Sequence, residues 1–204
     1  MNDIAPVRLE PPFEILAPAR QTAPLVVASP HSGDRYPPDF VSRSRLDFAT
    51  LRRSEDSFVD ALFGAAPDIG APLIRALFPR AYVDPNREPF ELDPAMFAGP
   101  LPDYVNARPP RVAAGLGTIA RVVANGEAIY RGKLAFADAE RRVASCYRPY
   151  HQALRELVDG TRAEFGVATL VDCHSMPSVG GPMERDPGAA RVEFALGDCH
   201  GVSG

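Results

Sequence analysis

Cysteine is scarce in this sequence of 204 residues, which contains only Cys146, Cys173 and Cys199, with no C-x-x-C spacing between them. An odd number of widely separated cysteines excludes a disulfide framework and indicates reduced thiols, as in a cytoplasmic protein. Residues 1–14 lack the basic start and apolar core of a signal peptide, and no apolar run is long enough to cross a membrane. We therefore expect a soluble, cytoplasmic protein.

Lysine is scarcer still, because Lys133 is the only one, and arginine carries nearly all of the positive charge. The formal net charge is -4 and the sequence pI is about 5.6, which argues against nucleic acid or an anionic membrane as the main partner. Guanidinium groups do bind small anions well, because their planar fork matches a carboxylate. The composition therefore supplies anion binders without the surface charge of a nucleic-acid-binding protein.

The length fits one sizeable domain, residues 1–204, that can bury a core without disulfides or a structural metal. No internal repeat and no second domain are evident, and the proline-rich residues 1–23 are expected to form an extended arm. Two apolar runs without alternation, Leu25–Ser29 and Ala168–Asp172, are typical of strands buried on both faces, as in parallel sheets covered by helices. The pattern predicts an α/β fold.

The rest of the chain predicts further elements. A helix is expected after Ser54, with Phe58, Val59, Leu62 and Phe63 on one face, and Pro149 should split a long helical stretch because proline does not fit a helix interior. The predicted segments are strands at Pro72–Leu77, Ala81–Asp84 and Val192–Leu196, a long loop at Phe90–Pro110, the helical stretch Glu127–Phe165 and a flexible flap at Pro177–Gly188.

Each of the two apolar runs is followed by a histidine, His31 after the first and His174 after the second. Ligands of open parallel sheets bind beyond the carboxyl ends of the strands, so the two histidines could meet in a metal site or an acid/base site. Side chains alternate along a strand, so Asp172 shares a face with His174, whereas Cys173 points into the core and is a poor nucleophile. Asp172 either orients His174 or caps a loop.

Two histidines leave a zinc site one ligand short, because catalytic zinc commonly has three protein ligands, often two histidines and a carboxylate. Asp34 forms an H-x-x-D pattern with His31. Glu55 and Asp56 stand at the start of the predicted helix, where the helix dipole alone would favour acidic residues. Spacing does not choose among these three carboxylates.

Five short motifs occur in an order that resembles the N-formylglutamate amidohydrolase family, over residues 24–201. They are Ser29-Pro30-His31-Ser32-Gly33, Glu55-Asp56 with Val59-Asp60, Tyr82-Val83-Asp84-Pro85-Asn86-Arg87, Arg148-Pro149-Tyr150-His151 and Asp172-Cys173-His174-Ser175. The resemblance implies a fold like that of the zinc carboxypeptidases and related phosphorylases and hydrolases, with a mixed, mostly parallel sheet flanked by helices. It implies one Zn²⁺ ion, held by His31, His174 and Asp56, with Glu55 as the alternative to Asp56.

The resemblance also implies that Asn86 and Arg87 hold a carboxylate of the substrate. The alternative for Arg87 is a surface arginine paired with Glu88 or Asp84. Arg80 and Arg121 are further candidates for a second carboxylate, and the glycine run before Arg121 lacks the strand, spacing and lysine of a phosphate loop. His151, which belongs to a family motif, is either a buried, hydrogen-bonded histidine or a group that acts in catalysis.

The activity implied is hydrolysis of a linear amide in a small N-acyl amino acid, with N-formyl-L-glutamate giving formate and L-glutamate. Hydrolysis of another acylated amino acid or peptide, and a non-catalytic metal- or ligand-binding relative, are the alternatives.

In the family, the chain continues beyond the turn matching Gly197-Asp198 to a strand that presents a glutamate as general base. We therefore expect this chain to bind metal, to turn over weakly and to form homo-oligomers through an open sheet edge. The candidates for a base within the chain are Glu55, Asp172, Glu184 and His200.

Overall fold

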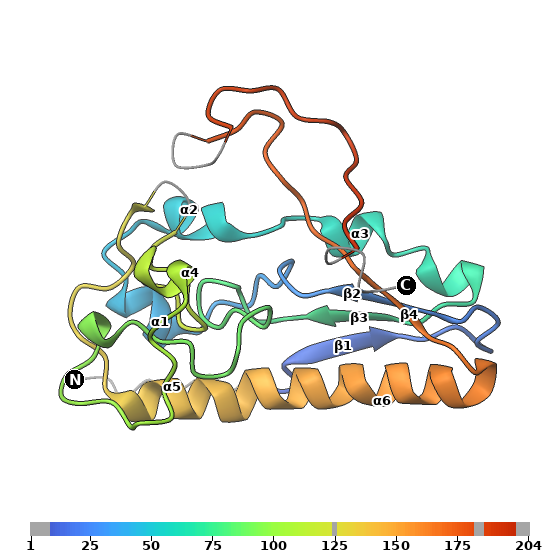
Figure 1. The fold of residues 1–204 in the computed structure, drawn as a ribbon, viewed down its shortest axis with the longest axis horizontal. Helices are drawn as coiled ribbons and strands as arrows, with labels where there is room; N and C mark the ends of the chain where they lie inside the picture. Colours follow the sequence, from blue (N-terminus) through green and yellow to red (C-terminus); the bar gives the residue numbers. More distant parts are fainter. Residues whose placement is uncertain (1–8, 124–125, 182–185, 199–204) are drawn as a thin grey trace.

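A four-stranded mixed sheet forms the centre of the computed structural model, which describes residues 9–123, 126–181 and 186–198 (Figure 1). The central strand β2 pairs in parallel with both β3 and β4, and β1 pairs antiparallel with β3, giving the order β1-β3-β2-β4. The mixed, mostly parallel sheet predicted from the sequence is confirmed. The strands are β1 (Phe13–Leu16), β2 (Leu25–Ser29), β3 (Leu73–Ala76) and β4 (Thr169–Asp172). Burial on both faces, predicted for the two apolar runs, holds for most of β2 but is wrong for β4, whose four residues are exposed because it is an edge strand.

Helices flank the sheet, and the longest of them, α6, runs along one of its sides and contacts β2 (Figure 1). The helices are α1 (Pro38–Arg43), α2 (Phe48–Leu51), α3 (Val59–Leu62), α4 (Pro110–Ala113), α5 (Phe136–Arg142) and α6 (Arg148–Phe165), with 3-10 turns at Arg52–Ser54, Ala66–Ile69 and Pro94–Met96. Among the described residues, no helix combines the length and the apolar character needed to span a bilayer.

Within the extended arm expected over residues 1–23, residues 13–16 form a regular strand, while residues 1–8 lie outside the described part. Residues 13–16 form β1, in which Phe13 is opposite Ala76 and Leu16 opposite Leu73. The tetrapeptide Phe-Glu-Ile-Leu contains β-favouring residues, and the prolines around it are tolerated because β1 is an edge strand.

The predicted strand Ala81–Asp84 is wrong, although all four residues are buried. The backbone N–H groups of Tyr82 and Val83 both donate to the carbonyl of Pro79, at 2.9 and 3.3 Å, so the segment turns instead of extending. A short apolar run indicates burial but does not by itself distinguish a strand from another buried conformation.

The predicted helix after Ser54 is also wrong in its extent, since α3 has a single turn. Phe58, the residue before α3, has φ of 67°, a left-handed conformation that cannot belong to a helix. Val59 is buried, but Phe58 and Leu62 are 74% and 77% exposed. The apolar residues in this stretch therefore do not form one buried face.

Pro149 does not split the long helix as predicted, and residues 127–135 are not helical. A π-helical turn, Val143–Tyr147, joins α5 to α6 without a break, and Pro149 lies in the first turn of α6. The N–H of Arg148 reaches the carbonyl of Val143, five residues back. This wider turn gives room for a proline ring that would clash with the carbonyl four residues before it in a regular helix.

The predicted loop Phe90–Pro110 is present but well packed, since Leu92, Met96 and Phe97 are buried. In the predicted flap Pro177–Gly188, Val179 forms an isolated antiparallel bridge with Ala190, and residues 182–185 lie outside the described part. The predicted strand Val192–Leu196 is absent, and its apolar side chains are exposed, because no described strand lies beside it.

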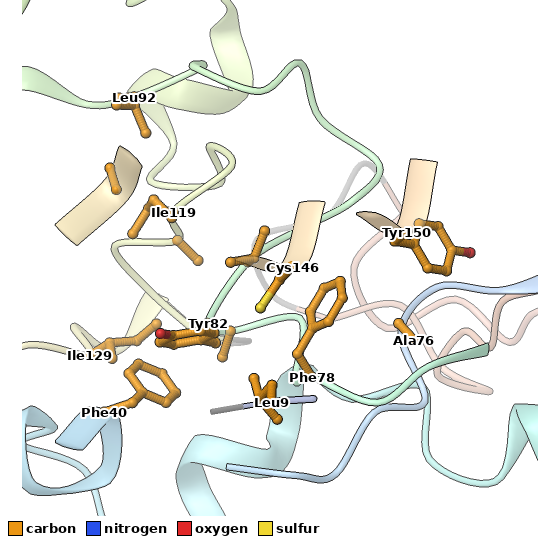
Figure 2. Packing of buried hydrophobic residues seen from close by; sticks show 14 of the residues in the cluster. Leu9, Phe40, Ala76, Phe78, Tyr82, Leu92, Ile119, Ile129, Cys146 and Tyr150 are labelled. Carbon is orange, nitrogen blue, oxygen red and sulfur yellow. The ribbon is translucent and has the colours of Figure 1, made fainter. Parts of the chain in front are cut away.

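The largest apolar cluster joins the turn at Tyr82 to α1, the end of β3 and the long helix (Figure 2). At its centre lies the Arg142 side chain, which is 1% exposed and whose guanidinium carbon lies 4.2 Å from the ring centroid of Tyr82 and 5.5 Å from that of Phe40. Cys146 and Cys173 are buried free thiols, as predicted, and Cys199 lies outside the described residues.

The backbone at Gly33 lies so close to that of Leu77 and Phe78 that a larger residue at position 33 should destabilise the fold. A Cβ on Gly33 would overlap the carbonyl oxygen of Phe78 and lie 2.7 Å from the carbonyl carbon of Leu77. We expect Gly33→Ala to lower the free energy of unfolding by about 1–3 kcal/mol, because backbone must shift. Gly160→Ala, in the exposed interior of α6 with open space around it, should raise it by about 0.5–1 kcal/mol. Urea unfolding measures both, and an unchanged midpoint for Gly33→Ala would contradict the packing.

Candidate metal centre

Neighbouring parallel strands bring the two predicted histidines together. β2 and β4 are paired with Val27 opposite Val171, so their carboxyl ends lie side by side. His31 and His174 each follow their strand by two residues, and their ring centroids are 4.8 Å apart. The expectation that the two histidines meet at one edge of the sheet is confirmed.

Asp56 completes a cluster of three side chains whose ligand atoms face one another. Nδ1 of His174 lies 2.9 Å from Oδ2 of Asp56 and 3.1 Å from Nδ1 of His31, and the remaining distance, from His31 Nδ1 to Asp56 Oδ2, is 3.4 Å. The Asp56 backbone is fixed to the first histidine segment, because its N–H donates to the carbonyl of His31 and its carbonyl accepts from Ser32 Oγ.

Two further carboxylates hold the outer nitrogens of the imidazoles. Nε2 of His31 lies 2.8 Å from Asp84 Oδ1, and Nε2 of His174 lies 3.0 Å from Asp172 Oδ2. A carboxylate accepts hydrogen bonds, so each Nε2 carries a proton, and in the neutral imidazole Nδ1 then carries a lone pair. The Asn86 amide also donates to Asp172 Oδ2, at 2.7 Å.

The centre of the cluster is therefore suited to a cation. When both imidazoles are neutral, two nitrogen lone pairs and one carboxylate oxygen converge there, with the ligand atoms 2.9–3.4 Å from one another. Tetrahedral zinc with ligand bonds of about 2.0–2.1 Å separates neighbouring ligand atoms by roughly 3.3 Å. Nitrogen and carboxylate ligands, each steadied by a second group, are also what zinc sites use. The residues present thus fit a metal ion of this kind.

The pKa shifts of His174, Asp56 and Asp84 also indicate a site suited to positive charge. Hydrogen bonds to Asp172 and Asp56 raise the pKa of His174 to about 9, so the metal-free cluster keeps a proton on this residue at neutral pH. Burial alone would raise the pKa of Asp56, but hydrogen bonds from His174 and His31 hold it below its ordinary value. The pKa of Asp84 is lowered in the same way, through His31 and Arg80. The site therefore attracts positive charge.

The other two carboxylates considered for the metal lie apart from this cluster. Glu55 accepts hydrogen bonds from Nε and Nη2 of Arg52, each at 2.9 Å, and one from Tyr36 Oη at 2.7 Å. These partners satisfy its buried side chain and turn it away from the histidines. Asp34 is exposed and lines a separate cavity beside Arg35 and Arg52. The fold thus brings Asp56 to the two histidines, whereas Glu55 and Asp34 are not part of the cluster.

A cavity of about 510 Å³ opens next to the cluster. It is lined by Asp56, Asp84 and Arg80, by the loop around Gly117 and by residues 175–177, among others. Arg80 donates from Nε to Asp84 Oδ2 at 3.2 Å, which places its guanidinium in the cavity wall. The cavity therefore offers a charged, partly enclosed space for a small molecule beside Asp56.

The remaining predicted residues lie around this centre or away from it. Arg87 donates to the carbonyls of Leu116 and Asn86, at 3.1 and 2.7 Å, and with His151 lines a second cavity of about 720 Å³. Asn86 is in contact with the cluster, because its amide nitrogen lies 3.0 Å from His174 Nε2. Arg121 pairs with Asp93 at 2.8 Å and lines a different cavity, so the fold does not bring it to the site.

Sequence reasoning missed Asp84, which it considered only as an ion-pair partner of Arg87. The two charged groups lie 3.9 Å apart, but the closest partner of Asp84 is His31 at 2.8 Å. The signal that could have identified Asp84 is its place within a family motif. Of the candidate bases, Glu184 and His200 lie outside the described residues.

The geometry predicts which carboxylate a metal ion needs. Asp56→Asn should weaken Co²⁺ binding by more than the roughly 10- to 100-fold that loss of an outer-sphere partner produces, since it removes a charged ligand. Glu55→Gln and Asp34→Asn should leave the affinity unchanged. Titration calorimetry measures the affinities, and circular dichroism checks the fold of each variant. Loss of binding in Asp34→Asn but not in Asp56→Asn would reverse the ligand assignment.

Comparison with proteins of known structure places this geometry in context. The crystal structure of N-formylglutamate amidohydrolase from Ralstonia eutropha JMP134 is 42% identical in sequence and superposes with a TM-score of 0.76, covering 82% of this chain and 59% of that one. The structure of a gene product from Agrobacterium tumefaciens, 17% identical with a TM-score of 0.58, covers 80% of this chain and 56% of that one and shares the fold.

Curated sequences give the same family. N-formylglutamate deformylase from Pseudomonas putida is 30% identical over 157 residues, 76% of this chain and 52% of that protein. The enzyme of that name from Pseudomonas aeruginosa is 29% identical over 167 residues, 81% of this chain and 56% of that protein. The chain thus spans about half the length of the curated relatives it matches. The sequence model of the family described as N-formylglutamate amidohydrolase matches residues 23–204, and the chain therefore belongs to this family.

Proposed function

We propose that this chain catalyses metal-dependent hydrolysis of N-formyl-L-glutamate to formate and L-glutamate. Its relatives carry the names N-formylglutamate deformylase and N-formylglutamate amidohydrolase. The observation that carries the proposal is the cluster of His31, Asp56 and His174, three groups able to hold a metal ion, beside a cavity of about 510 Å³. Amide hydrolysis by a metal site requires these two features together.

His31, Asp56 and His174 are the residues that would hold one zinc ion. When bound, zinc supplies a Lewis acid that polarises a carbonyl group and makes water more acidic. Asp84 and Asp172 keep the outer Nε2 atoms protonated and so direct Nδ1 of each histidine toward the centre. The chain thereby prearranges the ligand atoms before the metal ion arrives.

In this proposal, Arg80 and Arg87, which line two cavities, bind the carboxylates of an acidic substrate. Within the described residues, Arg80 hydrogen-bonds through its Nε to Asp84, so its two terminal nitrogens can bind a carboxylate in the cavity beside Asp56. Arg87 lies next to Asn86, which contacts His174, and is held by two carbonyls. Binding the glutamyl end at either position would hold the formyl amide at the metal centre.

The proposed function is tested by metal analysis combined with formate release. The purified chain should carry about one zinc per chain and release formate from N-formyl-L-glutamate. Removing zinc with a chelator should abolish release, and adding zinc should restore it. N-acetyl-L-glutamate and N-formyl-L-leucine test the acyl group and the acidic side chain. Metal binding without release from any substrate would indicate a non-catalytic relative, and preferred release from another acylated amino acid would indicate a different hydrolase.

Substitution of the arginines separates their roles. Arg80→Lys and Arg87→Lys should each lower kcat/KM on the order of tenfold or more, because a lost charge-assisted hydrogen bond costs about 1.5–3 kcal/mol. Zinc content should not change. Arg121→Lys should keep the wild-type kinetics, since Arg121 lines another cavity. Wild-type kinetics in Arg80→Lys or Arg87→Lys would remove that residue from the substrate site.

A further inference from the structure

Three side chains of the long helix donate hydrogen bonds to backbone carbonyls of one short segment, residues 82–87, here called the site loop. They come from α5, from the π-helical turn and from α6, and each bond ends on a different carbonyl of the loop. The bonds are Arg142 Nη1 to Tyr82 O (3.2 Å), Tyr147 Oη to Arg87 O (2.8 Å) and His151 Nε2 to Pro85 O (2.8 Å).

The π-helical turn explains why these donors share one face. In a regular α-helix, residues five apart lie about 140° apart around the axis, so Arg142 and Tyr147 would point in different directions. In a π-helical turn the hydrogen bond runs over five residues, which brings both side chains to the same side. His151 follows Tyr147 by one α-helical turn, and their ring centroids are 4.2 Å apart.

The site loop in turn holds both imidazoles of the metal cluster. Asp84 accepts from Nε2 of His31, and Asn86 donates to the Asp172 carboxylate that accepts from His174. The loop has no strand neighbours of its own, because its residues turn instead of extending. Its position is therefore set by the backbone bond from the Asp84 N–H to the Thr118 carbonyl and by side-chain bonds, of which Tyr147 and His151 provide the two that flank Asn86.

We propose that Tyr147 and His151 are positioning residues that fix the site loop, and through Asp84 and Asn86 the orientation of His31 and His174, for metal binding. The proposal rests on the function proposed above. It assigns His151 a role outside the chemical step, because its Nε2 is committed to the carbonyl of Pro85.

The protonation of His151 is consistent with this role. A carbonyl can only accept a hydrogen bond, so Nε2 carries the proton whether the ring is neutral or charged. Burial lowers the pKa of His151, and the hydrogen bond to the Pro85 carbonyl opposes this shift. The remaining nearby charges, Arg155 on its own helix and Asp172 on β4, have opposite effects on this pKa. The bond to Pro85 therefore does not depend on a charged imidazole.

The test compares variants that remove one donor each. Tyr147→Phe removes only a hydroxyl, and His151→Leu removes the ring donor, whereas His151→Gln keeps an N–H that can reach Pro85. The matched control is Thr161→Val, which removes a buried hydrogen bond of the same helix at 2.7 Å from Leu157 O, away from the site loop. Zinc affinity is measured by competition with a chromophoric chelator, and the ligand field by visible absorption of the Co²⁺-substituted chain.

We expect Tyr147→Phe and His151→Leu to weaken zinc binding on the order of tenfold and to change the Co²⁺ spectrum, as loss of outer-sphere support does. His151→Gln should recover most of the affinity, and Thr161→Val should match the wild type in both readouts despite a lower melting temperature. If Tyr147→Phe and His151→Leu behave like Thr161→Val, or if His151→Gln behaves like His151→Leu, the proposal is overturned.

A measurement on the metal-free chain separates this proposal from the proposed function. Amide hydrogen exchange at Asp84 and Asn86 should be faster in Tyr147→Phe and His151→Leu than in Thr161→Val, whether or not the wild type binds zinc or releases formate. Exchange rates equal to those of Thr161→Val would overturn the positioning role. Faster exchange together with a wild type that binds no zinc would keep the loop contact and refute only the metal-dependent function.

Discussion

The parallel pairing of β2 with β4 is the contact on which the rest of the structure depends. These strands are 140 or more residues apart in sequence, and their register places Ala28 opposite Asp172. Once this register is set, the residues two positions beyond each strand must approach one another. A slip by one residue would turn Asp172 and His174 together to the opposite face of the sheet, away from His31. The strand pairing therefore determines the metal site before any side chain contributes.

The two buried carboxylates of the site, Asp56 and Asp84, come from irregular segments around this strand pair. Asp56 precedes a left-handed residue, Phe58, and Asp84 lies in a buried turn. Neither segment could hold a carboxylate in place by sheet hydrogen bonds. Each is fixed instead by specific partners, the carbonyl of His31 for Asp56 and the Thr118 carbonyl for the N–H of Asp84. Fully buried Arg142 adds a charged group that stacks on Tyr82 and binds its carbonyl.

Sequence could predict the parts of this arrangement that depend on regular structure. Unbroken apolar runs identified β2 and β4, and the rule for strand ends placed His31 and His174 together. The short, mostly apolar run at Ala81–Asp84 was also predicted to be a strand but forms a turn, because burial alone does not extend a chain. Glu55 and Asp56 could not be distinguished by spacing, since Arg52 and Tyr36 decide which of the two turns away. Asp84 was missed because its partner His31 is far away in the sequence.

One feature of β4 links the metal site to its surroundings. The N–H of Thr169 donates to Pro24, just before β2, and that of Cys173 donates to Ala28 in β2. By alternation, the backbone groups of Leu170 and Asp172 face outward along an edge that no strand of the described residues covers. A strand added at this edge would bond the backbone of the residue whose carboxylate orients His174. Among the described strands, the edge that is open to pairing is therefore the one that presents the carboxylate supporting the second histidine.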